Sequence, residues 1–235
     1  GNSMKNRILM AAVVWVAAVF LVGCFPEEDS CNIRTAGIYV EYELTEQGNN
    51  ATARATFWPG DSPGGTYLEL GDCGDEIAVN GVVLQKEGSN PEYYEANIDA
   101  DDVYDFVFTR PDEGDYTSTI DNMPAPVEIE AISLSEIPLD EEFDIFWTDN
   151  DSGEIALLIS GDCIEDYPNL NGDDVADNGS HTVGAGAIEV ESNEIGESCA
   201  AEVELTRDVN GDLSSDLKGT IKGYTKDTAS FTSTP

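Results

Sequence analysis

Acidic and amide side chains gather in three stretches of the sequence that could bind a calcium ion. Two are short patterns, D-x-D-x-G at 149–153 and D-x-N-x-D at 208–212. The third is the run 165–178, in which Asp173, Asp174 and Asp177 are the candidate ligands. Loops rich in such oxygens suit Ca2+, but none of the three has the glutamate that an EF-hand carries at its twelfth position. Asp and Asn also favour ordinary turns, which is the alternative interpretation.

A G-x-S-x-G pattern at 60–64 places Ser62 where a nucleophilic serine could lie. That chemistry needs a strand before the serine and a helix after it, whereas glycines and another expected strand follow here. A Ser-His-Asp triad would also need His181, the only histidine in the chain, which begins an expected strand. Acidic residues are too numerous for any pair to identify a glycosidase. We therefore expect a turn at 60–64 and no enzymatic activity.

Four cysteines predict two disulfides. An even number of cysteines in an exported chain favours disulfides, and the four are Cys31, Cys73, Cys163 and Cys199. Three pairings are possible, and the division into two domains described below favours Cys31 with Cys73 and Cys163 with Cys199. Each bond would close a loop of about 40 residues and stabilise the fold by about 4 kcal/mol in the chain-entropy treatment. A zinc site is the alternative, but no C-x2-C spacing supports it.

The fifth cysteine, Cys24, ends an apolar segment near the start of the chain. Gly1-Asn2-Ser3 precede Met4, which looks like a natural start, so we interpret these three residues as a cloning scar. Lys5 and Arg7 then precede the uncharged run 8–22. At about 15 residues this run is short for a membrane-spanning helix, which needs about 20. We expect residues 1–23 to be the scar and a cleaved signal peptide.

The end of that segment, Leu21-Val22-Gly23-Cys24, resembles the bacterial lipobox. The resemblance implies that lipid is attached to the Cys24 thiol and that cleavage makes this cysteine the first residue. One acyl chain is a marginal anchor, so the several chains implied would be needed for a stable tether. Phe25 stands where family sorting rules place Asp for inner-membrane retention, which favours the outer membrane, on its periplasmic side or at the cell surface. An ordinary secretory signal and an uncleaved anchor are the alternatives.

The chain is strongly acidic, with 10 Lys and Arg against 48 Asp and Glu. Loss of Lys5 and Arg7 with the signal would lower the formal charge from −38 to −40. Nucleic acid and anionic lipid headgroups are therefore poor partners. Hydrophobic residues make up 40% of the chain and aromatic residues 9%, which is enough apolar surface for folded cores. Residues 24–235 suit two domains of about 100 residues each.

Similar sequence patterns recur in the same order in both halves. Three pairs of stretches match: Phe57-Trp58 through Gly71-Asp72-Cys73 with Phe146-Trp147 through Gly161-Asp162-Cys163, Phe108-Thr109-Arg110 with Leu205-Thr206-Arg207, and Tyr116-Thr117-Ser118-Thr119 with Phe231-Thr232-Ser233-Thr234. We infer tandem copies of one fold, domain 1 at 33–123 and domain 2 at 127–235. The Pro-containing linker 124–126 joins them, and a lipidated tether at 24–32 precedes them. The second copy would carry insertions at 165–178 and after Asp212.

Apolar residues alternate with polar residues in both halves, which predicts strands. Ile38, Val40, Tyr42 and Leu44 show the two-residue period, and Asn80-Gly81 is a strong hairpin signal. The fold class expected is all-β, with two tandem immunoglobulin-like or fibronectin-like β-sandwich domains. The whole pattern also resembles uncharacterised tandem-domain lipoproteins of Gram-negative bacteria, which implies no activity.

These observations predict a non-enzymatic envelope lipoprotein that is held at the membrane by lipid on Cys24 and meets a protein or glycan partner. A Ca2+-dependent adhesin-like or polysaccharide-binding protein is one alternative. An accessory subunit of an envelope assembly or export complex is another. Trp58 and Trp147 recur at matching positions beside Phe57 and Phe146, which favours a shared structural role. An aromatic residue exposed in only one copy would be the better candidate for binding.

Overall fold

The computed structural model describes residues 27–71, 73–88, 92–138, 140–150, 153–165, 167, 173–189 and 198–234. Strands fill both halves, and within these ranges the only helices are the 3-10 turns η1 (Ser30–Asn32) and η2 (Thr35–Gly37). The all-β fold class is thereby confirmed. None of the helices in the described ranges has the length and apolar character to cross a membrane. Cys24 and the expected signal segment lie outside the described residues.

The N-terminal half is a sandwich of two antiparallel sheets. Its first sheet has the order β2 (Ile38–Gln47), β3 (Asn50–Pro59), β8 (Tyr93–Asp99), β7 (Gln85–Glu87). Its second has the order β10 (Gly114–Ile120), β9 (Tyr104–Arg110), β5 (Glu76–Val79), β6 (Val82–Val83), and the short strands β1 (Glu27–Asp29) and β4 (Tyr67–Glu69) pair beside them. Taken in chain order, these are the A-B-E-D and G-F-C-C′ sheets of an immunoglobulin-like domain.

The C-terminal half repeats this arrangement. One sheet has the order β11 (Ile129–Ile132), β13 (Phe143–Trp147), β16 (Ser180–Val183). The other has the order β15 (Asp173–Ala176), β14 (Glu154–Gly161), β17 (Cys199–Asn210), β18 (Lys218–Thr234), and β12 (Glu136–Pro138) runs parallel to the end of β18. The expectation of two β-sandwich domains is confirmed.

The period of two in the sequence sets which face of each strand is buried. In β2, Val40, Tyr42 and Leu44 are fully buried, while the residues between them face outward. Tyr42 stacks on Phe106 of the opposite sheet, with ring centroids 5.0 Å apart. The C-terminal core is separate and is built around Ile145, Trp147, Leu157, Val203 and Phe231.

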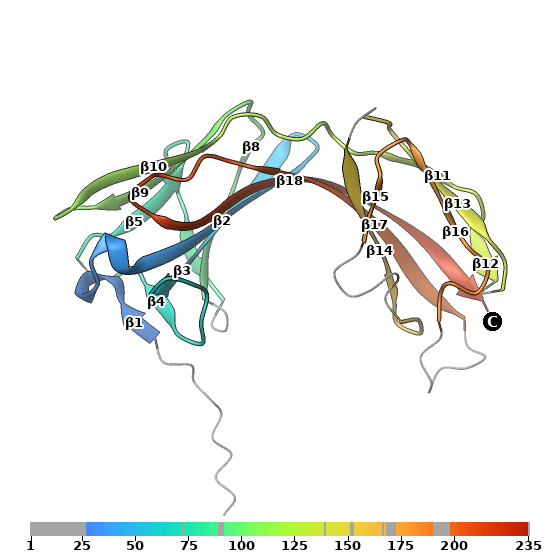
Figure 1. Ribbon diagram of the computed structural model, residues 1–235, viewed down its shortest axis with the longest axis horizontal. Helices are drawn as coiled ribbons and strands as arrows, with labels where there is room; N and C mark the ends of the chain where they lie inside the picture. The colour runs from blue at the N-terminus through green and yellow to red at the C-terminus, as the bar shows by residue number, and fades with distance from the viewer. Residues whose placement is uncertain are drawn as a thin grey trace, which may run out of the picture.

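Strand β18 joins the two halves into one sheet. Its residues Lys218–Thr225 run parallel to Tyr39–Glu46 of β2, while β17 pairs antiparallel along its other side. The resulting strand order is β15-β14-β17-β18-β2-β3-β8-β7. Figure 1 shows the two sandwiches as the sides of an arch, with β18 running through its top from one side to the other.

We call residues 208–225 the arm, because this part of the second copy packs on the first. Leu217 and Ile221 of the arm belong to the N-terminal core. Asp212 exchanges two backbone hydrogen bonds, of 2.9 and 2.8 Å, with Thr119 of β10. The arm therefore covers both β2, in one sheet, and β10, in the other.

Two of the expected boundaries are corrected. The cores do separate at the linker, but the arm belongs to the N-terminal sandwich rather than to a domain formed by all of 127–235. An uncovered edge strand such as β2 would leave unpaired backbone groups, and the arm satisfies them. Residues 27–32 are also part of this sandwich rather than a free tether, because β1 pairs with β4 and η1 follows it.

The sequence repeat predicted equivalent strands in the two halves, and this prediction is correct for some strands and wrong for one. Trp58 and Trp147 lie in the third strand of each half, β3 and β13, and Arg110 and Arg207 lie in β9 and β17, which precede the last strand. The matched cysteines, however, follow strands that are not equivalent. Cys73 follows β4, a short strand paired with β1, whereas Cys163 follows β14 of the large sheet.

Candidate functional site

The two disulfides form as expected. Cys31 is bonded to Cys73 and Cys163 to Cys199, each with a Cα–Cα distance of 5.9 Å. The first bond ties the segment after β1 to the segment after β4, and the second ties the segment after β14 to the start of β17. Each half of the molecule therefore contains one disulfide, and neither bond links the two halves, as the domain division predicted.

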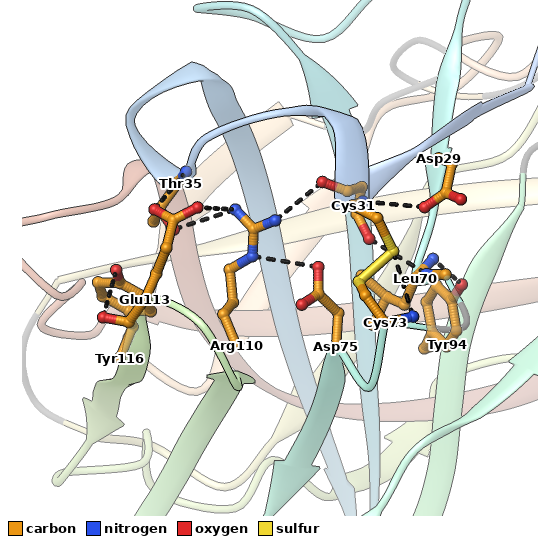
Figure 2. Close-up of polar contacts among 12 residues, drawn as sticks. Asp29, Cys31, Thr35, Leu70, Cys73, Asp75, Tyr94, Arg110, Glu113 and Tyr116 are labelled. Atoms are coloured by element: carbon orange, nitrogen blue, oxygen red, sulfur yellow. Dashed lines mark hydrogen bonds and ion pairs between the residues drawn. A yellow bond between two sulfur atoms is a disulfide. The ribbon is translucent and has the colours of Figure 1, made fainter.

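Beside the first disulfide, Arg110 is buried among polar groups of the N-terminal half (Figure 2). Its Nε lies 3.1 Å from Asp75 Oδ2, and its Nη2 donates to the carbonyl oxygen of Ser30 at 2.8 Å. Its Nη1 donates to Thr35 Oγ1 and lies 3.2 Å from Glu113 Oε1. Burial favours a higher pKa for Glu113, but hydrogen bonds from Thr35 and the charge of Arg110 outweigh it and lower that pKa.

The matching residue of the second half, Arg207, is buried in a different set of partners. Its Nε lies 2.7 Å from Asp177 Oδ2, and its Nη2 donates to Asp177 Oδ1 at 2.9 Å. Its Nη1 donates to the linker carbonyl oxygens of Ala125, at 3.1 Å, and Pro126, at 2.7 Å. The indole Nε1 of Trp147 donates to Asp177 Oδ1 at 2.8 Å. Arg207 thus fixes the linker against the second sandwich.

This network corrects the calcium prediction at Asp177. Burial favours a higher pKa for Asp177, but hydrogen bonds from Arg207 and Trp147 and the charge of Arg207 outweigh it and lower the pKa. Both carboxylate oxygens already accept hydrogen bonds, so this side chain is not available to a metal ion.

The other candidate ligands, Asp173 and Asp174, lie in β15, paired with β14, and not in a loop. Among the described residues, the only group of acidic, cysteine or histidine side chains close enough to share a metal is Asp29, Cys31 and Cys73, where both sulfurs are in a disulfide. Calcium binding by Asp173 and Asp174 therefore stays a prediction.

Ser62 and His181 lie in different sandwiches. Ser62 is exposed in the loop between β3 and β4, and His181 lies in β16, opposite Ile145 of β13. The aromatic pairs differ between the halves as well. Phe57 and Trp58 are both buried, whereas Trp147 is buried and Phe146 is 39% exposed. Phe146 is thus the aromatic residue exposed in one copy only.

A groove of about 560 Å3 lies on the outward face of the continuous sheet, where the arm leaves β2 and enters the second sandwich. It is within the size range of small-molecule sites. Strands β2, β3 and β8 of the first half and β18 of the second supply its lining. These residues are Glu43, Thr45, Gln47, Asn50, Thr52, Arg54, Asn97 and Lys226.

The groove is lined by hydroxyl, amide and paired charged groups. Thr52 Oγ1 donates to Asn97 Oδ1 at 3.0 Å, and Lys226 Nζ lies 3.3 Å from Glu204 Oε2. Arg54 donates two hydrogen bonds to Glu95 Oε2, at 3.1 and 2.8 Å. Its guanidinium also lies 4.2 Å from the ring centroid of Tyr93. The two basic groups at the groove, Arg54 and Lys226, are therefore held in place.

The side chains of Thr45, Gln47 and Asn50 make no hydrogen bond with any residue of the described ranges, so their polar atoms are free to meet a ligand. Gln47 and Asn50 face each other across the turn that joins β2 to β3. Sequence reasoning missed this site because outward residues of alternating strands look like an ordinary solvated surface. The sequence did contain one signal for this site: the hydroxyl and amide side chains Thr45, Gln47, Asn50 and Thr52 lie close together in an otherwise very acidic chain.

The basic residues of the chain are also concentrated on this face. Arg54, Lys218, Lys222 and Lys226 account for half of the eight basic residues that follow Arg7 in the sequence. Each is paired with a carboxylate: with Glu95, Asp61, Asp208 and Glu204, respectively. The four basic side chains on the outward face of the continuous sheet are therefore all engaged by carboxylates.

No protein-family model matches the chain. No curated protein matches it either. Murine CEACAM1b is a similar solved structure, at 8% sequence identity and a TM-score of 0.23, with 83% of this chain and 99% of that chain covered. Fibronectin(III)-like modules of CbhA from Clostridium thermocellum are similar at 13% identity and a TM-score of 0.23, with 84% and 93% covered. The sandwich fold of this chain is defined by its own strand order and register.

Proposed function

We propose that the protein is a lipid-anchored envelope protein that acts as a non-enzymatic binding module. The observation that carries this proposal is the groove on the continuous sheet, because its walls come from both halves and the arm fixes the halves together. A rigid, preformed site loses little conformational freedom when it binds a ligand. The separation of Ser62 from His181 in different sandwiches supports a non-catalytic role.

The lipid anchor rests on the sequence that ends at Cys24. The two disulfides support export, since such bonds persist in oxidising compartments. The acidic surface would also keep the sandwiches away from anionic membrane headgroups, so the anchored protein would project from the bilayer rather than lie on it. Phe25 favours the outer membrane as the location.

The anchor is tested by expression of the full chain in a Gram-negative host that is fed an alkyne analogue of palmitate. We expect label on the wild-type protein and none on a Cys24→Ser variant. A Phe25→Asp variant is the matched control, because it should keep the label but move to the inner-membrane fraction. An unlabelled wild-type protein, or a labelled Cys24→Ser variant, would refute lipidation at this residue.

A further inference from the structure

We propose that the groove between β2, β3, β8 and β18 binds a neutral polysaccharide. This inference rests on the proposed binding function and names the ligand class for the same site. Three properties of the groove carry it: the chemistry of its free side chains, its charge, and its position at the junction of the two halves.

The free side chains match the chemistry of sugar hydroxyls. A sugar hydroxyl both donates and accepts hydrogen bonds, and so do the hydroxyl of Thr45 and the amides of Gln47 and Asn50. Thr52 and Asn97, already bonded to each other at 3.0 Å, add an ordered pair beside them. No large apolar side chain is among the lining residues, so the groove offers no apolar pocket for the Trp or Tyr side chain with which a protein partner usually anchors itself.

The charge of the groove disfavours ionic ligands of either sign. Arg54 and Lys226 are already paired with Glu95 and Glu204, which leaves little positive charge for an anionic polymer. The net charge of −38 would also repel such a polymer at long range. Glu43 is the only acid in the lining and offers a single carboxylate to a cation. A neutral, hydroxyl-rich ligand needs no free charge in the groove and is not repelled by the net negative charge of the chain.

The position of the groove makes it a preformed site. Lys226 comes from β18 just past Thr225, the last residue paired with β2, and the other lining residues come from the first half. The pairing of Lys218–Thr225 with Tyr39–Glu46 holds these walls at a fixed separation. An open face lined by extended strands also suits a chain-like ligand that continues beyond the groove at both ends.

Binding can be tested with the full chain purified in a mild detergent, at 0.15 M NaCl, on immobilised polysaccharides. The neutral probes are starch, mannan, xylan and β-1,3-glucan, and the anionic probes are alginate and polygalacturonate. We expect saturable binding to at least one neutral polymer and none to the anionic ones. A Gln47→Ala/Asn50→Ala double variant should bind at least tenfold more weakly, because two neutral hydrogen-bonding groups are lost.

The matched control is Thr220→Ala, an exposed hydroxyl in β18 on the same sheet face but outside the groove. It should bind within twofold of the wild type, and all variants should unfold at the wild-type temperature. The inference is overturned if the wild type binds no neutral polymer, if it binds only the anionic ones, or if the double variant binds normally. If the wild type is lipidated but binds no neutral polymer, the polysaccharide inference fails and the lipid anchor stands. If the protein is not lipidated but binds a neutral polymer, the anchor fails and the polysaccharide inference stands.

Discussion

The two sandwiches share a strand order but differ in whether their cores include residues from the other half. The N-terminal core includes Leu217 and Ile221, which come from the arm of the second copy. The described C-terminal core takes no residue from before the linker. Equivalent arginines show the same difference, since Arg110 contacts only its own half while Arg207 also holds the linker carbonyl oxygens of Ala125 and Pro126.

This asymmetry shows how a tandem repeat is joined through one continuous sheet. The arm lengthens the last hairpin of the second copy and adds it to the free edge of the first. Two domains joined only by a linker of a few residues would move relative to one another. Here backbone hydrogen bonds, apolar packing and a buried arginine all fix the junction at which the groove lies.

Separating the halves gives the largest effect we expect. A 27–123 fragment loses Leu217 and Ile221, whose burial contributes roughly 3–6 kcal/mol, a large share of the stability of a domain. It should be largely unfolded, whereas a 124–234 fragment should unfold cooperatively on its own. Urea titration followed by fluorescence separates the two, because Trp58 and Trp147 are the single tryptophans of these fragments. Mixing the fragments should restore the first transition, and an N-terminal fragment as stable alone as in the full chain would contradict the asymmetry.

Substitution of the two arginines distinguishes a local network from one that spans the junction. Arg207→Met and Arg110→Met each leave a buried carboxylate unpaired, Asp177 or Asp75, so each should cost about 3–5 kcal/mol. Arg110→Met should weaken only the transition of the first half. Arg207→Met should weaken both transitions. Adding Asp177→Asn should recover part of the loss, and a double variant no more stable than Arg207→Met would argue against an unpaired charge as the cause.

Gly219→Ala tests the contact between the arm and β2. An added Cβ would lie 1.8 Å from the carbonyl oxygen of Val40, and the backbone there has a φ of +141°, which favours glycine. We expect a loss of about 1–3 kcal/mol in the first half and faster hydrogen exchange at residues 39–46. Gly64→Ala is the control, because nothing lies within 4 Å of the new Cβ. Equal effects of the two substitutions would show that β2 does not depend on the arm.

The lowered pKa of Asp177 makes its stabilising effect depend on pH. Its usual value is 3.8, and the native value lies below it, so the ionised form stabilises the fold well above pH 3.8. This contribution is lost as the pH falls through the native pKa, because protonation removes the pairing with Arg207. The stability difference between wild type and Asp177→Asn, measured by urea unfolding, should therefore shrink between pH 5 and pH 2.5. A constant difference would show that the carboxylate charge is unimportant.

The smallest expected effect is a gain in stability within the first core. Tyr42 is fully buried, and its hydroxyl has no hydrogen-bond partner in the part of the chain that the structure describes. An unsatisfied buried hydroxyl costs about 1–3 kcal/mol, so Tyr42→Phe should stabilise the first half by up to about 1 kcal/mol once the small void is counted. Tyr94→Phe is the contrast, because the Tyr94 hydroxyl accepts a hydrogen bond from the Leu70 amide at 2.7 Å. That variant should be destabilised, and thermal unfolding of both would settle the sign.

The sequence by itself determined which residues face inward and which cysteines pair. The period of two in residues 38–44 is a local property, since successive side chains of any strand point to opposite faces. The order of matched patterns separated the two cores and so predicted the disulfide partners. Lipidation of Cys24 stays a prediction from the lipobox pattern.

Only the tertiary structure decided where the arm pairs and therefore where the groove forms. A two-residue period tells which face of Lys218–Thr225 is buried but not which strand lies beside it, because an edge strand offers the same backbone groups to any partner. For the same reason, Asp177 looked like a free ligand in an acidic stretch until the fold placed Arg207 and Trp147 against it. Pairing between distant segments depends on which edges and charges the fold leaves unsatisfied, and local sequence does not encode that.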